Sequence, residues 1–312
     1  MTVNIKLPQN NNYSIFIDKL KQITIDTKVV IVTNPTVSGF HLQYLREFIN
    51  AKELSVCTVP DGEQYKNMDT IDLILSHCFE QRLDRKSVLV ALGGGVIGDM
   101  TGFAASIYQR GIDFIQVPTT LLSQVDASVG GKTGVNNKYG KNLVGAFWQP
   151  NAVYIDPSFL DTLPKREFAA GVAEIIKMAV TFNKDFVQWL EVNDLNKSEN
   201  IKLAIQKSVE TKAWVVSQDE RERGIRAALN YGHTFGHVVE NETNYKEYLH
   251  GEAVGIGMVM ANELAVEIGY MSEQEAKRVQ NLLEKYNIPT QYNIKDVEDF
   301  YEHFFLDKKS ID

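Results

Sequence analysis

Three of the six histidines lie in one short stretch, in a pattern suited to binding a metal ion. His233 and His237 stand four residues apart, so a helix would place both rings on one face. His250 follows soon after, and a catalytic zinc typically takes three protein ligands and keeps one position open. Spacing alone predicts His233, His237 and His250 as ligands, with Glu174, inside an apolar helical pattern, as the competitor. The alternative is that these rings only pack or cap helices.

Several cationic side chains stand in glycine-rich or apolar surroundings that do not need a charge. Each one alone would be an ordinary solvated charge. Gathered at one cleft, they would bind an anionic substrate through charge-assisted hydrogen bonds. They are Lys132, Lys141, Lys177, Lys212, Arg226 and the pair Lys308 and Lys309.

A glycine-rich segment follows the strand-like residues 87–92 and fits G-x-G-x-x-G through Gly93, Gly95 and Gly98. Glycines permit a tight turn and let the backbone of a helix start approach a pyrophosphate. The alternative is a turn that is glycine-rich for packing alone. The acidic ribose partner of this motif is expected at the end of the next strand, whereas Asp113 begins that strand. Asp99, at the start of the helix, is a better candidate for a cofactor hydroxyl, unless it only complements the helix dipole.

The elements that must position these residues change character along the chain. Continuous β-branched runs, typical of parallel strands buried on both faces, occur at residues 29–33, 54–59, 87–92, 114–117 and 153–155. Helical patterns occur at residues 68–81, 165–181, 200–218, 230–241, 252–268 and 272–286. We therefore expect an α/β Rossmann-like nucleotide-binding domain at residues 1–156 and an all-α metal-binding domain at residues 157–312.

The composition of the 312 residues is that of an ordinary globular protein, with 44% hydrophobic and 23% charged residues. A net charge of −8 argues against nucleic-acid binding, which usually needs a basic face. The two cysteines, Cys57 and Cys78, form no CxxC pair, which fits a reducing compartment. No signal peptide and no apolar run long enough to cross a membrane is visible. We expect a soluble, cytoplasmic protein.

Six motifs together resemble the 3-dehydroquinate synthase family, in the family's order and between about Asp61 and Lys309. They lie at residues 93–99, 118–133, 140–147, 173–177, 229–237 and 250–254. The resemblance implies a lyase of the shikimate pathway, on the route to chorismate and the aromatic amino acids. It would convert 3-deoxy-D-arabino-heptulosonate 7-phosphate to 3-dehydroquinate and phosphate by transient NAD oxidation, phosphate elimination, re-reduction and aldol closure.

The resemblance also implies roles for individual residues. Zinc or cobalt would be held by Glu174, His233 and His250, and His237 would then support the ligands from behind or face the substrate. Positions for substrate contact or catalysis match Asp126, Lys132, Lys141, Asn142, Lys177, Lys212, Arg226, Asn230 and His237, with Lys308 or Lys309 at the phosphate. NAD would contact Glu63, Lys66, Gly93, Gly94, Gly95, Gly98, Asp99, Thr119, Thr120, Lys132 and Lys141, although Thr119 and Thr120 could simply cap a helix. Arg110 matches an arginine that reaches the neighbouring subunit's site, which implies a homodimer.

Two departures from the family pattern bear on this interpretation. Asn34 stands where the family usually has an aspartate, which puts one cofactor contact in question. Family chains generally continue past the position of Asp312 with a closing strand, so a shortened sequence or an unusual C-terminus is expected.

Three other functions compete with this one. A sister sugar phosphate cyclase would bind a substrate without the carboxylate, and Arg226, Lys212 and Asn230 argue against it. An iron-dependent polyol dehydrogenase would not need so many phosphate-binding lysines. A non-enzymatic scaffold would not need Glu174, His233 and His250.

Overall fold

The computed structural model describes residues 1–7, 11–243 and 246–306. The chain divides into two compact units. Unit 1 comprises Met1–Leu163 and Lys212–Arg221, and unit 2 comprises Pro164–Thr211 and Glu222–Asp312. The domain boundary proposed near Asp156-Pro157 lies shortly before the end of the first segment of unit 1.

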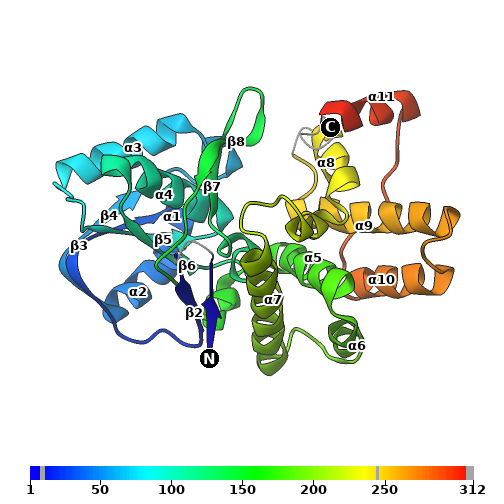
Figure 1. The fold of residues 1–312 in the computed structure, drawn as a ribbon, viewed down its shortest axis with the longest axis horizontal. Helices are drawn as coiled ribbons and strands as arrows, with labels where there is room; N and C mark the ends of the chain where they lie inside the picture. Colours follow the sequence, from blue (N-terminus) through cyan, green and yellow to red (C-terminus); the bar gives the residue numbers. More distant parts are fainter. Residues whose placement is uncertain (8–10, 244–245, 307–312) are drawn as a thin grey trace. The chain divides into compact units, whose positions relative to one another are not determined.

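Unit 1 is built on a seven-stranded sheet in the order β1-β2-β9-β6-β5-β3-β4, with a separate β7-β8 hairpin (Figure 1). All neighbours in the large sheet are parallel except β1 and β2. The strands are β1 Thr2–Ile5, β2 Tyr13–Ile17, β3 Ile23–Thr33, β4 Ile49–Thr58, β5 Val88–Gly93, β6 Asp113–Pro118, β7 Lys132–Asn137, β8 Gly140–Phe147 and β9 Ala152–Ile155. The helices are α1 Pro35–Val37, α2 Gln43–Phe48, α3 Met68–Glu80 and α4 Gly95–Ile107.

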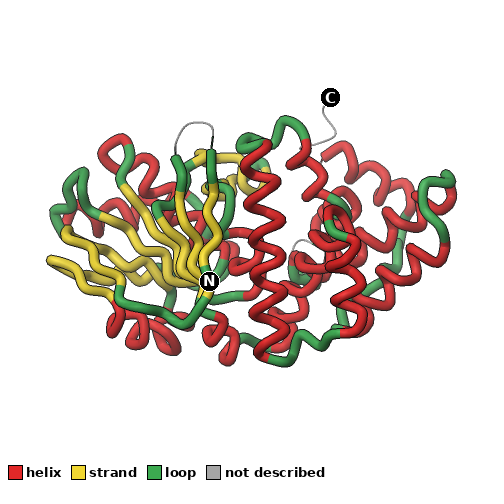
Figure 2. Tube along the Cα trace, turned by 60° about the horizontal axis from the view of Figure 1, so that its bottom comes forward, coloured by secondary structure: helices red, strands yellow, loops and turns green. Residues whose placement is uncertain are grey.

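Both faces of this sheet are buried, which explains the uninterrupted apolar runs. Val30 and Val32 pack toward the side of α3 and α4, together with Ile71. Val29 and Ile31 pack on the opposite side, in a core that includes Leu45 of α2. Successive residues of one strand therefore enter two different cores, as the alternation of side chains along a strand requires. Figure 2 shows helices on both sides of the strands of this unit.

Unit 2 consists of helices and connecting loops, and its described residues contain no strand (Figures 1 and 2). Its helices are α5 Lys165–Phe182, α6 Lys184–Val192, the greater part of α7 Ser198–Gln218, α8 His233–Glu242, α9 His250–Glu267, α10 Glu273–Lys285 and α11 Val297–Glu302. Among the described residues, every helix is too short or too polar to cross a lipid bilayer. The predicted fold class, an α/β domain followed by a helical one, is confirmed.

The sequence patterns missed four strands and misplaced one helix start. β1 and β2 are short, β7 (KTGVNN) is mostly polar and β8 is largely exposed, so all four lack the apolar runs that marked the other strands. The helix expected from Asn230 begins instead at His233. Asn230 ends a short 3₁₀ segment, and Gly232 between them is left-handed (φ 77°), which breaks the helical path.

Candidate functional site

The glycine turn lies where the order of the sheet reverses. From β3 the chain goes outward to β4 and then returns to the other side of β3 as β5. Ligands of open α/β sheets bind at the carboxyl ends of strands flanking such a switch. Gly93 ends β5, Gly94 precedes α4, and no side chain of the described residues caps that helix start. Its first N–H groups are therefore available to an anion, which is what the motif would require.

Two glycines of the turn also allow α4 to approach the sheet closely. A Cβ added at Gly98 would lie 2.6 Å from Oε1 of the buried Gln116 on β6. At Gly94 it would lie 3.1 Å from the Thr120 methyl group. The turn thus offers backbone N–H donors, and at Gly94 and Gly98 it has no room for a larger side chain.

Asp99 and Lys66 form an ion pair beside this turn. Lys66 Nζ donates to Asp99 Oδ2 and to Asn142 Oδ1, both at 2.6 Å. Burial alone would lower the pKa of Lys66, but the carboxylates of Asp99 and Glu63 raise it on balance. Burial raises the pKa of Asp99. Asp99 lies in the second turn of α4 rather than at its start, so the helix-dipole explanation of this residue is wrong.

The β7-β8 hairpin is fastened to the segment that holds Lys66. Asn136 donates its backbone N–H to the Lys66 carbonyl at 2.8 Å and its side-chain amide to Glu63 at 2.8 Å. Its side-chain oxygen accepts the N–H of Asn142, a left-handed residue (φ 54°), at 2.8 Å. Lys132 and Lys141 lie on the two strands of this hairpin. The structure therefore gathers several predicted cofactor residues around one hairpin.

Asn34, which stands where the family usually has an aspartate, caps helix α1. Its Oδ1 accepts the N–H of Val37 at 2.8 Å, and its amide donates to Asp61 at 2.9 Å. An aspartate at position 34 would place a second carboxylate beside that of Asp61, and the two negative charges would repel each other. The amide of Asn34 instead donates a hydrogen bond to Asp61.

Thr119 and Thr120 follow β6 and have structural bonds of their own. Thr119 is buried and donates its N–H to the Gly93 carbonyl at 3.0 Å. Thr120 Oγ1 accepts the N–H of Ser123 at 3.2 Å, which is the capping contact considered for this residue.

Asp126 and Lys212 also form an ion pair within unit 1. Lys212 Nζ donates to the Asp126 carboxylate and to its backbone carbonyl, both at 2.6 Å. Lys212 belongs to the last part of α7, which is counted with unit 1. Arg110, also in unit 1, is exposed and has a left-handed backbone (φ 72°).

In unit 2 three potential metal ligands converge from three helices. Glu174 lies on α5, His233 begins α8 and His250 begins α9. One ligand atom from each residue lies within 4.8 Å of the other two, and no other such group occurs among the described residues. The ring of His237 lies near both histidines, 5.5 Å and 6.3 Å between centroids, but outside the group. The three residues that lie together are therefore Glu174, His233 and His250, as the family resemblance implies. The three histidines that spacing alone predicts do not form this group.

The donor atoms of this group suit a divalent cation. Glu174 Oε2 accepts a hydrogen bond from Lys177, whereas Oε1 is buried and has no hydrogen-bond partner among the described residues. A buried carboxylate oxygen left this way is costly without a cation. Burial, helped by the charge of Lys177, holds the pKa of His233 well below its usual value, so this ring is neutral and able to coordinate. Burial lowers the pKa of His250, but the hydrogen bond to Glu240 and the carboxylate charges raise it on balance.

Close helix packing brings the three ligands together. A Cβ at Gly251 would meet the Ala170 carbonyl oxygen of α5 at 2.0 Å. A Cβ at Gly257 would meet the Gly232 carbonyl oxygen at 2.0 Å. Only glycine permits these backbone approaches of α9, so the motif glycines around His250 determine where the ring lies.

The remaining predicted residues of unit 2 lie just before α8 or outside the described residues. Arg226 is 1% exposed in the 3₁₀ segment Ile225–Asn230. Asn230 donates to Glu222 Oε1 at 2.9 Å. Lys308 and Lys309 lie outside the described residues. Sequence reasoning missed the buried Glu240, whose only signal was an acidic residue one helical turn after His237.

A solved structure with the same architecture binds the two cofactors expected above. The chain is similar to ValA, 2-epi-5-epi-valiolone synthase from Streptomyces hygroscopicus, solved with NAD+ and Zn2+ bound. The identity is 28%, the TM-score is 0.82, and the match covers 90% of this chain and 80% of that one. Fold and cluster thus define a class of proteins with a nucleotide-binding sheet and a helical metal unit.

Comparisons of sequence narrow this class. The family model for the 3-dehydroquinate synthase N-terminal part matches residues 56–170, and that for the C-terminal part matches residues 171–310. A 3-dehydroquinate synthase of a Sulfurovum species is 69% identical over 99% of this chain and 89% of its own length. That of Sulfurimonas denitrificans is 68% identical over 100% of this chain and 90% of its own length. The chain belongs to the 3-dehydroquinate synthase family.

Proposed function

We propose that the chain is a 3-dehydroquinate synthase, a lyase that converts 3-deoxy-D-arabino-heptulosonate 7-phosphate to 3-dehydroquinate and phosphate. The observation that carries this proposal is the group of Glu174, His233 and His250 in a chain matched along both halves by one family. In the reaction a ring hydroxyl is oxidised to a ketone, which acidifies the neighbouring C–H. Phosphate then leaves by β-elimination, the ketone is reduced again, the sugar ring opens, and an intramolecular aldol reaction closes the carbocycle.

The two cofactors supply chemistry that side chains lack. When bound, NAD accepts and returns the hydride, and zinc or cobalt lowers the pKa of the reacting hydroxyl as a Lewis acid. Glu174, His233 and His250 would hold the metal ion, with Glu174 Oε1 as the atom that lacks another partner. Gly93, Gly94, Gly95 and Gly98 would receive the pyrophosphate of NAD at the start of α4.

Charged residues would bind and orient the substrate. Lys132, Lys141, Lys177 and Lys212 would neutralise the phosphate and the developing enolate. Arg226 would bind the carboxylate, because its planar guanidinium matches two oxygens at once. Asp126, Asn142, Asn230, His237 and one of Lys308 and Lys309 would orient the remaining polar groups, since positioning accounts for much of the rate.

Phosphate release and NADH absorbance, followed together, test this function. Purified protein receives the substrate with NAD and zinc, before and after chelation. We expect metal-dependent phosphate release without accumulation of NADH, because the hydride returns within each turnover. NADH accumulation without phosphate would instead identify a dehydrogenase, and no release would contradict the proposal.

An Arg226→Lys variant tests recognition of the carboxylate. Lysine keeps the charge but loses the planar fork, so KM should rise more than kcat falls. Thermal unfolding of the same variant serves as the control for folding, because Arg226 is 1% exposed. An unchanged KM for a folded variant would favour a substrate without the carboxylate.

We also propose a cytoplasmic homodimer in which Arg110 reaches the partner's site. Arg110 is exposed and held in a left-handed conformation, which costs free energy that a function would justify. The two free cysteines, Cys57 and Cys78, are buried, in keeping with a reducing compartment. Sedimentation analysis should give a dimer. An Arg110→Ala variant mixed with an inactive His233→Ala variant should recover activity that neither has alone, because one site of the mixed dimer then holds both residues. No gain on mixing would contradict the proposal.

A further inference from the structure

Both histidines of the metal group hold their Nδ1 atoms against an oxygen acceptor. His233 Nδ1 lies 3.3 Å from the Tyr231 carbonyl oxygen. His250 Nδ1 lies 3.3 Å from Glu240 Oε2. In a neutral imidazole, the nitrogen beside an acceptor carries the proton and the other nitrogen is left to bind metal. Both rings are thereby set to coordinate through Nε2.

The two acceptors differ in charge. The Tyr231 carbonyl is neutral. The hydroxyl of Tyr231 donates a hydrogen bond to Asn262 Oδ1 of α9 at 2.5 Å, which holds this residue in place. Glu240 is a carboxylate whose side chain is 4% exposed. A buried carboxylate is less costly where a donor faces it, and the His250 ring lies at hydrogen-bond distance from Glu240.

The position of Glu240 suits such a role. It lies near the end of α8, and His250 begins α9, two helices that pack against each other (Figure 1). A hydrogen bond across these helix ends fixes the orientation of the ring. We propose that Glu240 is the positioning residue that orients His250 and strengthens its bond to the metal ion, an inference that rests on the proposed metal site.

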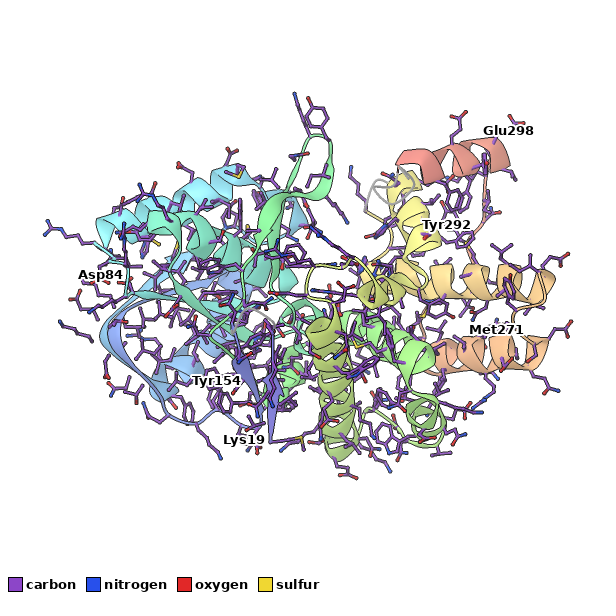
Figure 3. All side chains as sticks on the ribbon, viewed as in Figure 1. Lys19, Asp84, Tyr154, Met271, Tyr292 and Glu298 are labelled. Carbon is purple, nitrogen blue, oxygen red and sulfur yellow. The ribbon has the colours of Figure 1, made fainter. Side chains whose placement is uncertain are left out.

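Glu242, two residues further along α8, provides a matched control. Its carboxylate accepts the hydroxyl of Tyr292 at 2.5 Å. Tyr292 is labelled in Figure 3 and lies in the segment between α10 and α11. Both glutamates thus lie on one helix and face a ring-bearing residue, which is His250 of the metal group for Glu240 and Tyr292 for Glu242.

Titration of the metal-free protein with Co2+ tests the inference. Affinity is measured by competition with a chelator, and the visible absorption of bound Co2+ reports the ligand geometry. We expect Glu240→Gln to weaken Co2+ binding by about tenfold and Glu240→Ala by up to about 100-fold, with a shifted absorption band. Glu242→Gln should leave affinity and band unchanged. Glu240→Asp, which keeps the charge on a shorter side chain, should bind better than Glu240→Gln.

The outcomes separate this inference from the metal site itself. If the parent binds Co2+ and Glu240→Gln, folded by circular dichroism, binds it equally well, Glu240 only packs and the inference fails alone. If the parent does not bind Co2+, or His233→Ala does not weaken binding, the metal site fails and the inference fails with it. If Glu240→Gln does not fold, Glu240→Ala replaces it: a folded Ala variant with parental affinity and band overturns the inference.

Discussion

Unit 1 offers a ligand the backbone N–H groups at one strand end, whereas unit 2 assembles a metal group from side chains on three helices. In unit 1 the turn depends on the absence of side chains, because a Cβ at Gly94 or Gly98 would meet Thr120 or Gln116. In unit 2 it depends on specific donor atoms of Glu174, His233 and His250. Glycines matter there too, but as spacers that bring helices together.

This difference teaches how each unit should respond to mutation. Removing one side chain should abolish the site of unit 2, since each ligand is a third of the group. Adding one methyl group should damage the site of unit 1, whose donors belong to the backbone. The following experiments test that contrast.

The largest effect is expected from loss of one ligand in unit 2. His233→Ala should lower phosphate release by roughly 1000-fold, because Lewis-acid chemistry accounts for several kcal/mol of the barrier. Chelation of the parent should have a similar effect, reversed by zinc. His77→Ala, which removes a ring whose contact is Ser55 in unit 1, should leave activity unchanged. A His233→Ala enzyme with parental activity and metal content would refute the ligand assignment.

The next effect concerns the ion pair of Lys66 and Asp99 beside the glycine turn of unit 1. Lys66→Met leaves the Asp99 carboxylate without its cation and should destabilise the fold by about 1–3 kcal/mol at neutral pH. Burial already raises the pKa of Asp99, and loss of Lys66 should raise it further. The cost should therefore grow as pH rises past the pKa of Asp99 in the parent and be complete above the higher pKa of Asp99 in the variant.

Urea unfolding of Lys66→Met and parent at acid and neutral pH checks this. The difference between them should shrink in acid, where Asp99 is protonated. A difference that does not change with pH would mean that Lys66 contributes by packing alone. Co2+ binding should stay unchanged, because the pair belongs to unit 1.

A smaller effect is expected from one methyl group at the turn. Gly98→Ala should weaken NAD binding by about tenfold, because the new Cβ forces the buried Gln116 side chain and α4 to shift. Calorimetric titration with NAD measures the change. Gly39→Ala, at a glycine with open space around it, is the control and should bind NAD like the parent. Equal affinity of the Gly98→Ala protein would show that the turn does not receive the cofactor.

The smallest effect concerns a surface pair remote from either site. Arg278 donates to Glu191 at 2.7 Å and 2.9 Å and thereby lowers the pKa of that carboxyl. Both side chains are substantially exposed, so Arg278→Ala should cost only about 0.2–1 kcal/mol. The contribution is present above the ordinary glutamate pKa and is lost as pH falls through the lowered one. Urea unfolding of parent and Arg278→Ala at neutral pH should show a smaller difference in the free energy of unfolding at high salt than at low salt. A destabilisation as large as that of Lys66→Met would contradict this expectation.

Much of the fold was predictable from local pattern. The continuous runs at 29–33 and 87–92 marked central parallel strands, because strands buried on both faces need no polar alternation. β7 and β8 escaped prediction, because their segments are largely exposed or glycine-rich and resemble loops. The helix start at His233 escaped as well, because the left-handed Gly232 depends on its packing against α9.

The sequence by itself determined the glycine turn, because a strand followed by G-x-G-x-x-G within a few residues specifies its own geometry. It also supplied the ligand candidates, although spacing favoured His237 over Glu174. Only the tertiary structure decided which atoms converge, since Glu174 joins His233 and His250 through the packing of α5, α8 and α9. The same packing decided that Glu240 lies beside His250. Local spacing specifies neighbours along one helix, whereas a site made from several helices depends on how closely their backbones approach.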